Sequence, residues 1–477
     1  MALNRIILWL GYSFLYAATL MAISALAGFA FGELEQASIF GGITIGISLL
    51  GAVFVFSTRM MPGKESFTEA LTFLIAFWLV MPLVVMLPFL LSNITNSPIQ
   101  AYFEGVSAIT TTGASSLDPD QLPKTLHIWR SLVQWSGGVI VATFAVVILA
   151  ALNLKGTGVH RSLLFTFKKG ELWQQLLSVS QIIILIYGLV SLVCFTFLVA
   201  SGTSVFEAIC LSLTSVSTGG LTPSGEPLAF YVHGIGLFAL CLSCFLGAVN
   251  VAVLWDILRN RTLFDLNKLI SNVEHRSLIV LIGVIFVIGC FYTDFEHFMT
   301  VLPEAIFFAS STGYDYHVIG VEMVPPVILI SIALIGGSAL STTGGLKLIR
   351  ILLLFKHLDT DMDRLTHPTR VVPVLFRGQR LADSAFLSIW MYFVGYTMVF
   401  AAGILLLAGA GLEFSVAVAS SAASVSNMGP LLAATMPATG FEDFTAAQML
   451  IASTLMLIGR IEVLAAFAFF SPRLWRS

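Results

Sequence analysis

Charged residues are scarce in this chain of 477 residues: Asp, Glu, Lys and Arg make up 10% of it, whereas 57% is hydrophobic. Soluble domains carry roughly 25% charged residues. A soluble protein cannot hide so much apolar surface, so the composition indicates an integral membrane protein. Apolar runs along the whole chain exceed the roughly 20 residues with which a helix spans a bilayer. Runs of this length exclude barrel strands, and we predict an all-α membrane fold.

Cysteines and catalytic motifs are also few. The five cysteines lie in apolar segments, where the C-x-x-C pair of Cys241 and Cys244 is more often a packing feature than a redox or metal site. The sequence lacks G-x-S-x-G, H-E-x-x-H and Walker motifs, and its eight histidines show no ligand spacing. We therefore expect no enzyme, no cofactor and no nucleic-acid partner.

The distribution of charge predicts the topology. We place ten apolar spans near residues 4–31, 37–57, 71–92, 128–152, 173–200, 230–257, 277–293, 325–358, 384–410 and 446–470. Lysine and arginine gather on alternate sides of these spans, in residues 59–64, 155–169, 259–276, 364–380 and 473–476. The positive-inside rule puts these segments and both termini in the cytoplasm. The opposite segments are acidic, and an acidic outer face concentrates cations.

Four stretches rich in Thr, Ser and Gly interrupt the outer segments: "AITTTGAS" at 108–115, "SVSTGGLT" at 215–222, "ASSTGYD" at 309–315 and "SVSNMGP" at 424–430. Each follows an apolar piece that is too short to span a bilayer. Their central glycines are 106, 94 and 116 residues apart, and are Gly113, Gly219, Gly313 and Gly429. The chain thus repeats a unit of span, half-helix, glycine turn and span.

The repeat predicts the organisation of the chain. We expect a helical pair at 1–65, followed by four membrane–pore–membrane repeats at 66–158, 159–262, 263–365 and 366–477. Backbone groups in a turn at membrane depth must line protein or water, because lipid cannot satisfy them. Four such turns around one axis would present carbonyl and hydroxyl oxygens that replace the hydration shell of a monovalent cation. The alternative is that these small residues mark tight helix packing.

Several motifs resemble the Trk/Ktr/HKT superfamily of cation transporters, most closely the bacterial TrkH-type potassium-translocating subunits. They are "WRSLVQWSGGVIVATFAVVIL" (129–149), "GGSALSTTGGLKLIRILLL" (336–354), "HPTRVVPV" (367–374) and "LIGRIEVLAAFAFFSPRLWR" (457–476), together with the four turns. The resemblance covers nearly the whole chain and implies four repeats around one pore.

The resemblance also implies the selectivity filter, where K+ would bind. Its residues are Thr111, Thr112, Gly113, Thr218, Gly219, Thr312, Gly313, Asn427, Met428 and Gly429. Relatives that conduct mainly sodium often carry serine at the first filter position, so Gly113 favours potassium. The fourth turn departs from the Thr–Gly pair, and none of the turns matches the fuller T-V-G-Y-G of potassium channels, so selectivity is expected to be looser.

Residues 336–347, "GGSALSTTGGLK", hold four glycines: Gly336, Gly337, Gly344 and Gly345. Each glycine costs a helix about 1 kcal/mol relative to alanine, so an uninterrupted helix is not expected here. By resemblance this segment, the gate loop, obstructs the pore under the filter, and deleting or shortening 338–345 should raise cation flux. The alternative is a packed kink in a Gly/Ser-rich helix.

The last span carries two charges, Arg460 and Glu462. Residues two apart point to different helix faces and do not pair. By resemblance the arginine faces the pore below the filter, where a cation repels potassium and binds carbonyls of the gate loop. The alternative is a structural ion pair between helices. Lys347 is a second gate candidate, unless its side chain extends to the cytoplasmic interface.

The leading functional prediction is potassium uptake across a bacterial inner membrane. An inside-negative potential contributes about 2.3 kcal/mol per charge per 100 mV, or roughly 50-fold accumulation, so no coupling ion is required. The alternatives are an alternating-access symporter of K+ with H+ or Na+, and a less selective Na+/K+ pathway. The resemblance implies a homodimer and a cytosolic nucleotide-binding subunit of the TrkA type. The basic segment "HPTRVVPVLFRGQR" (367–380) could bind that subunit or anionic lipid, or only set the topology.

Overall fold

The computed structural model describes residues 2–58, 67–95, 97–152, 172–259, 272–293, 298–316, 324–367, 375–376, 379–380 and 383–461. Over these ranges the protein is helical, apart from an antiparallel pair of two-residue strands, β1 (Leu375–Phe376) and β2 (Gln379–Arg380). Six spans in the described part are long and apolar enough to cross a membrane. They are α1 (Ala2–Phe31), α2 (Leu34–Thr58), α3 (Phe67–Val85) with α4 (Leu87–Leu91), α7 (Leu172–Ala200), α12 (Val273–Tyr292) and α16 (Asp383–Gly409). The prediction of a multi-pass helical membrane protein is confirmed.

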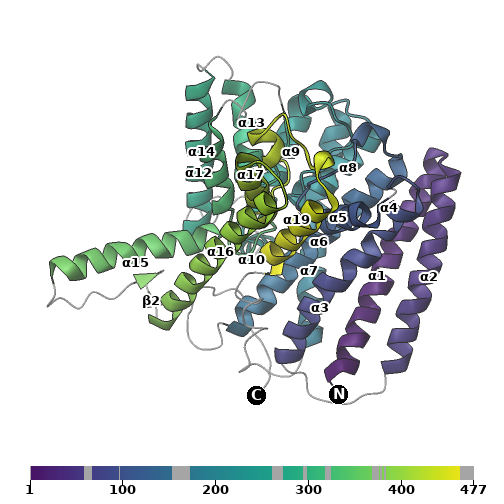
Figure 1. Ribbon diagram of the computed structural model, residues 1–477, viewed down its shortest axis with the longest axis horizontal. Helices are drawn as coiled ribbons and strands as arrows, with labels where there is room; N and C mark the ends of the chain where they lie inside the picture. Colours follow the sequence, from purple (N-terminus) through teal and green to yellow (C-terminus); the bar gives the residue numbers. More distant parts are fainter. Residues whose placement is uncertain are drawn as a thin grey trace.

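The first two helices form a pair at one edge of the molecule (Figure 1). Glu33, between them, holds the pair to the start of α6 (Lys124–Leu152), because its carboxylate accepts the backbone N–H groups of Lys124 and Thr125, both at 2.9 Å. The Lys124 ammonium lies 5.5 Å from the ring centre of Phe31 and 5.4 Å from that of Phe206. Phe206 lies in α8 (Val205–Val216), so these contacts also connect the helical pair to that helix.

Four short helices precede the glycine turns, and each has 12 residues: α5 (Pro98–Ile109), α8 (Val205–Val216), α13 (Phe298–Ala309) and α17 (Phe414–Val425). A 12-residue helix is about 18 Å long and cannot cross a hydrocarbon core of about 30 Å. Two of them begin at local signals, α5 with Pro98 in its first turn and α8 with a capping box between Ser204 and Glu207. The short pieces predicted from the sequence are therefore half-helices.

Two of the predicted spans are broken. Residues 325–358 divide into α14 (Pro326–Ile335) and α15 (Leu348–Thr366) on either side of the gate loop, as predicted. Residues 230–257, predicted as one span, form α9 (Gly234–Ala248) and α10 (Val251–Arg259), which meet at 106°. This second break was missed because neither residue at it, Val249 or Asn250, is a strong helix breaker.

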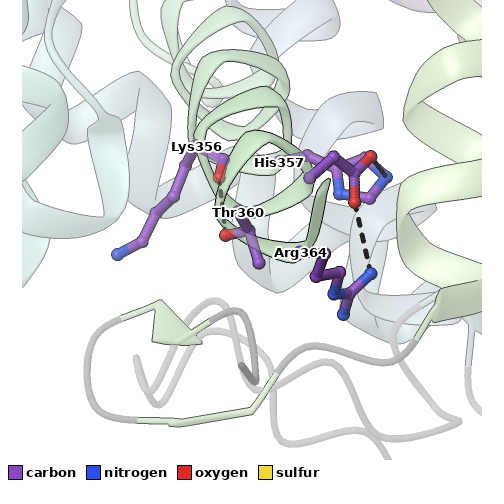
Figure 2. A network of polar contacts seen from close by, with 5 residues as sticks. Lys356, His357, Thr360 and Arg364 are labelled. Carbon is purple, nitrogen blue, oxygen red and sulfur yellow. Dashed lines mark hydrogen bonds and ion pairs between the residues drawn. The ribbon is translucent and has the colours of Figure 1, made fainter. Parts of the chain in front are cut away.

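Helix α15 extends away from the other helices (Figure 1). On its polar face Asp361 pairs with His357 at 3.6 Å and with Arg364 at 3.2 Å, and Thr360 donates to the Lys356 carbonyl at 2.9 Å (Figure 2). Pairs three and four residues apart stabilise an exposed helix by a few tenths of a kcal/mol each. Near its start, the Arg350 guanidinium stacks on Tyr392 of α16 at 3.9 Å.

Several predicted features lie outside the described residues. These include the basic residues in 59–64, 155–169, 261–268, 370 and 473–476, the motif residues 368–374, and Glu462. The five cysteines lie within the described part, where their thiols are free and buried. Cys241 and Cys244 belong to a hydrophobic cluster with Leu198 and Phe307, which agrees with a packing role.

Candidate functional site

The four turns after the short helices share one backbone conformation. A non-glycine residue in each has a φ of 50–55°, which is uncommon for such residues: Thr111, Thr218, Ser311 and Asn427. The N–H of the following residue bonds to the carbonyl five positions earlier, at 2.9–3.0 Å, in Thr112, Gly219, Thr312 and Met428. Segments of different sequence thus fold into the same turn, which is the strongest structural sign of an internal repeat.

The common conformation fixes the alignment of the turns. Gly113 and Gly313, two residues after the positive-φ position, have φ values of 77° and 67°. In the second turn the matching residue is Gly220, with a φ of 76°, rather than the predicted Gly219. Gly219 instead matches Thr112. The sequence "STGG" offers two adjacent glycines, and only the backbone angles distinguish them.

The four turns meet one another in chain order and close a ring. A Cβ atom on Gly113 would overlap the carbonyl oxygen of Gly219, and one on Gly220 would overlap that of Thr312. A Cβ on Gly313 would lie 2.9 Å from Cβ of Pro430. The fourth turn returns to the first, because Gly429 N donates to the Thr112 carbonyl at 2.6 Å. Glycine is needed where backbones approach this closely.

Many of the hydroxyl groups in the turns bond to the protein itself. One hydroxyl in each turn donates to a carbonyl in the last turn of its short helix, at 2.7–3.1 Å: Thr110, Ser217, Ser310 and Ser426. The Thr112 hydroxyl lies 2.7 Å from that of Thr110 and accepts from Asn427 Nδ2 at 3.0 Å. The short helices end at the ring, where their C-terminal dipoles carry partial negative charge and favour a cation.

Arg460, on α19 (Ala446–Ile461), reaches the first turn and the gate loop together. Its guanidinium donates to the carbonyls of Thr110, Thr111 and Thr342, the last at 2.6 Å, and to the Thr111 hydroxyl. The side chain is 7% exposed. The bond to Thr342 is the expected contact with the gate loop. A buried cation therefore links the first turn to the loop.

The gate loop also contacts the other turns. The Thr218 hydroxyl donates to that of Thr342 at 3.1 Å, and Gly344 N donates to the Ser311 hydroxyl at 3.2 Å. A Cβ on Gly344 would overlap the Ser426 carbonyl oxygen. The Lys347 side chain folds back onto the loop: it is buried, and its ammonium donates to the carbonyls of Ser341, at 3.1 Å, and Thr343. The loop thus lies against the second, third and fourth turns and reaches the first through Arg460.

On the opposite side, a cavity of about 630 Å³ opens over the ring. Gly113, Gly220 and Gly429 line it, as do the exposed acidic residues Asp118 and Glu442. These two residues belong to the acidic segments that were expected to concentrate cations. Glu104, whose position nine residues before Gly113 supports the register of the repeat, is a buried carboxylate that accepts the N–H of Ser116 at 2.7 Å, three residues past Gly113.

Four half-helices that bring glycine turns into one ring are typical of helical membrane proteins that transport cations. The sequence comparisons name the family. The profile of the TrkH family, described as cation transport proteins, matches residues 36–477, and the chain belongs to this family. It is accordingly a transport protein and not an enzyme.

Relatives of known function are similar over most of their length. The chain is 28% identical over 440 residues to the Trk system potassium uptake protein TrkH of Salmonella typhimurium, covering 90% of each. It is 29% identical over 418 residues to the Trk system potassium uptake protein TrkG of Escherichia coli K12, covering 85% of this chain and 84% of that one. The crystal structure of the potassium transporter TrkH from Vibrio parahaemolyticus matches the fold with a TM-score of 0.88 at 24% identity, covering 100% of both chains.

Proposed function

We propose that this chain is a potassium uptake protein in which K+ passes through the ring of four turns. The observation that carries the proposal is the closure of that ring by contacts between successive turns. Backbone oxygens and four helix C-termini at one place can stabilise an ion without its hydration shell. Without such groups, moving the ion into a low dielectric costs on the order of tens of kcal/mol.

The filter in this proposal consists of the ten residues predicted from the sequence, with Gly220 added for the second turn. The four repeats 66–158, 159–262, 263–365 and 366–477 each supply one turn, and the pair 1–65 stands outside them. In the first turn, Arg460 occupies the carbonyls of Thr110 and Thr111, so K+ and the guanidinium compete for the same oxygens. Arg460, Lys347 and the gate loop then hold the pathway closed below the filter.

The proposed setting follows from the relatives and from the charge pattern. The chain would lie in a bacterial inner membrane with both termini in the cytoplasm and the 630 Å³ cavity outside. A homodimer and a TrkA-type cytosolic nucleotide-binding subunit are proposed as partners, the second to act on the gate loop. The membrane potential alone suffices to drive K+ inward.

The test is rubidium uptake by a potassium-transport-deficient bacterial host that expresses this chain, with sodium as competitor. The wild-type chain should restore uptake. Gly113→Ser places a side chain where the ring leaves no room for a Cβ, so the ring must change shape and the preference for Rb+ over Na+ should fall. Absence of uptake from the well-expressed wild-type chain in the membrane would contradict the proposal.

An alternating-access symporter is the second candidate, and the break between α9 and α10 favours it, since broken spans form the substrate sites of such transporters. Recordings from planar bilayers containing the purified protein distinguish the two. Discrete single-channel events support a pore, whereas coupled proton or sodium flux without such events supports symport.

A further inference from the structure

The break between α9 and α10 leaves backbone groups without helical partners, and the gate loop supplies those partners. Ser338 N donates to the Ala248 carbonyl at 3.2 Å, and Thr342 N donates to the Gly247 carbonyl at 3.3 Å. In the opposite direction, Val251 N donates to the Leu340 carbonyl at 3.1 Å. Buried backbone groups are rarely left unpaired. If one segment moved alone, these hydrogen bonds would break and leave buried N–H and C=O groups without partners.

A buried carboxylate joins the same two segments from a third one. Glu274, in the first turn of α12, accepts the gate-loop N–H of Ala339 at 3.1 Å and the Asn250 side-chain amide at 3.4 Å. Its side chain is completely buried. The neighbouring His275 lies with Nε2 3.4 Å from Asn250 N. Glu274 thus contacts both the gate loop and the break.

We propose that Glu274 is a positioning residue that holds the gate loop to the break between α9 and α10, so that residues 336–347 and 247–251 open and close as one unit. The inference rests on the proposed function only in calling this unit a gate. Its physical content is a coupling between two segments from different repeats. A hydrogen bond to a charged group is among the stronger ones in a protein, and losing this one leaves Ala339 N–H buried without its acceptor.

The first test does not depend on transport. Amide hydrogen exchange is measured on the purified full chain in lipid nanodiscs, for wild type, Glu274→Ala and Glu274→Gln. Glu69→Gln is the matched control, because it neutralises another buried carboxylate, which pairs with Arg5 at 2.8 Å. Glu274→Ala should raise exchange about tenfold in 338–342 and in 249–251 together, and Glu274→Gln less, since its amide oxygen still accepts a hydrogen bond. Faster exchange in one segment alone, or in neither, overturns the proposal.

The second test records single channels of the same four proteins. Glu274→Ala should raise the ratio of open to closed time about tenfold while the unitary conductance and the K+/Na+ permeability ratio stay at wild-type values, because the filter is untouched. An unchanged ratio in both Glu274 variants overturns the role in gating. If Glu274→Ala raises exchange in both segments but the wild-type protein conducts no ion, the proposed function fails and the coupling between the segments stands. If Glu274→Ala does not fold, Glu274→Gln and Asn250→Ala give the same comparison.

Discussion

At the scale of single residues, Arg460 offers the clearest test of the gate. Its guanidinium holds two carbonyls of the first turn and one of the gate loop. Arg460→Gln removes the charge and most of these donors, so K+ no longer competes with a fixed cation for the Thr110 and Thr111 oxygens. Two charges at 4 Å with an effective dielectric constant of 20 interact by about 4 kcal/mol, so even a fraction of this implies at least about tenfold faster rubidium uptake.

Arg460→Lys is the control for Arg460→Gln. It keeps a positive charge but cannot span three carbonyls, because an ammonium lacks the planar fork of a guanidinium. Uptake by Arg460→Lys should lie between those of wild type and Arg460→Gln. Wild-type uptake kinetics in Arg460→Gln, at equal amounts of protein in the membrane, would show that Arg460 is only structural.

Glu104 lies in α5 and contacts the residues that follow the first turn, not the turn itself. Its carboxylate accepts the N–H and hydroxyl of Ser116, at 2.7 and 3.0 Å, and the hydroxyl of Ser115, at 3.1 Å. These bonds fix the chain just beyond Gly113. Glu104→Ala should loosen this segment and lower the K+/Na+ permeability ratio about three- to tenfold, whereas Glu104→Gln should lose less. Reversal potentials under bi-ionic conditions measure the ratio, and an unchanged ratio in Glu104→Ala would contradict this role.

At the scale of elements, the ends of the gate loop lie together. Leu346 N and Lys347 N donate to the carbonyls of Leu334 and Ile335, both at 2.9 Å, and Leu348 N donates to that of Gly337 at 2.9 Å. Residues 338–343 can therefore be removed and the chain rejoined with little movement of α14 and α15. Their removal should raise rubidium uptake at least about tenfold, because it takes away the Thr342 contacts to Thr218 and Arg460.

The matched control for the loop deletion replaces residues 338–343 with six glycines. It keeps the length and the backbone of the loop but removes the hydroxyl contacts of Ser341, Thr342 and Thr343, so its uptake should be intermediate. Equal uptake by wild type and the deletion, with both proteins present in the membrane, would show that the loop does not obstruct the pathway.

The sequence predicted those elements that composition controls. The four half-helices were predictable because a short apolar run ends in Thr, Ser and Gly, and the gate loop because it holds four glycines in 12 residues. The break at Val249 and Asn250 was not, since the hydrogen bonds that stabilise it come from the gate loop, some 90 residues away in sequence. Asn250, a polar residue within an apolar run, was its only local signal.

The site was predictable in its members more than in their contacts. The four turns were predicted from their similarity to one another, and the ten filter residues within them from the family resemblance; the turns do meet. The equivalence of Gly220 to Gly113 depends on φ values that two adjacent glycines leave open. The contacts of Glu104 and Glu274 were not predictable, because a lone acidic residue carries no signal of what folds against it. Such contacts are set by tertiary packing.

At the scale of the whole molecule, the ring is made by a single chain, so its four sides differ. The first and third turns carry Thr112 and Thr312, whose hydroxyls lie 2.7 and 2.8 Å from those two residues earlier, whereas Gly219 and Met428 occupy the same position in the other turns. A ring of four identical subunits cannot vary in this way. The asymmetry allows Arg460 to bind the first turn alone, while the gate loop contacts the other three turns directly.

Charge also collects at the cavity over the ring, and the last prediction concerns that charge. Asp118 and Glu442 line the cavity of about 630 Å³ above the ring, where they should raise the local concentration of K+. Asp118→Asn combined with Glu442→Gln should therefore raise the KM for rubidium uptake about two- to fivefold at low ionic strength, with little change in the maximal rate. Asp118 also accepts the N–H of Asp120 at 3.0 Å, a bond that the Asn side chain can keep, so the local fold should survive. Because mobile ions screen exposed charges over about 10 Å at 0.1 M, the difference in KM should shrink when a non-transported salt is added. A KM difference that persists at high salt, or a fall in the maximal rate alone, would mean that these carboxylates act on the structure of the turns and not through the field of the cavity.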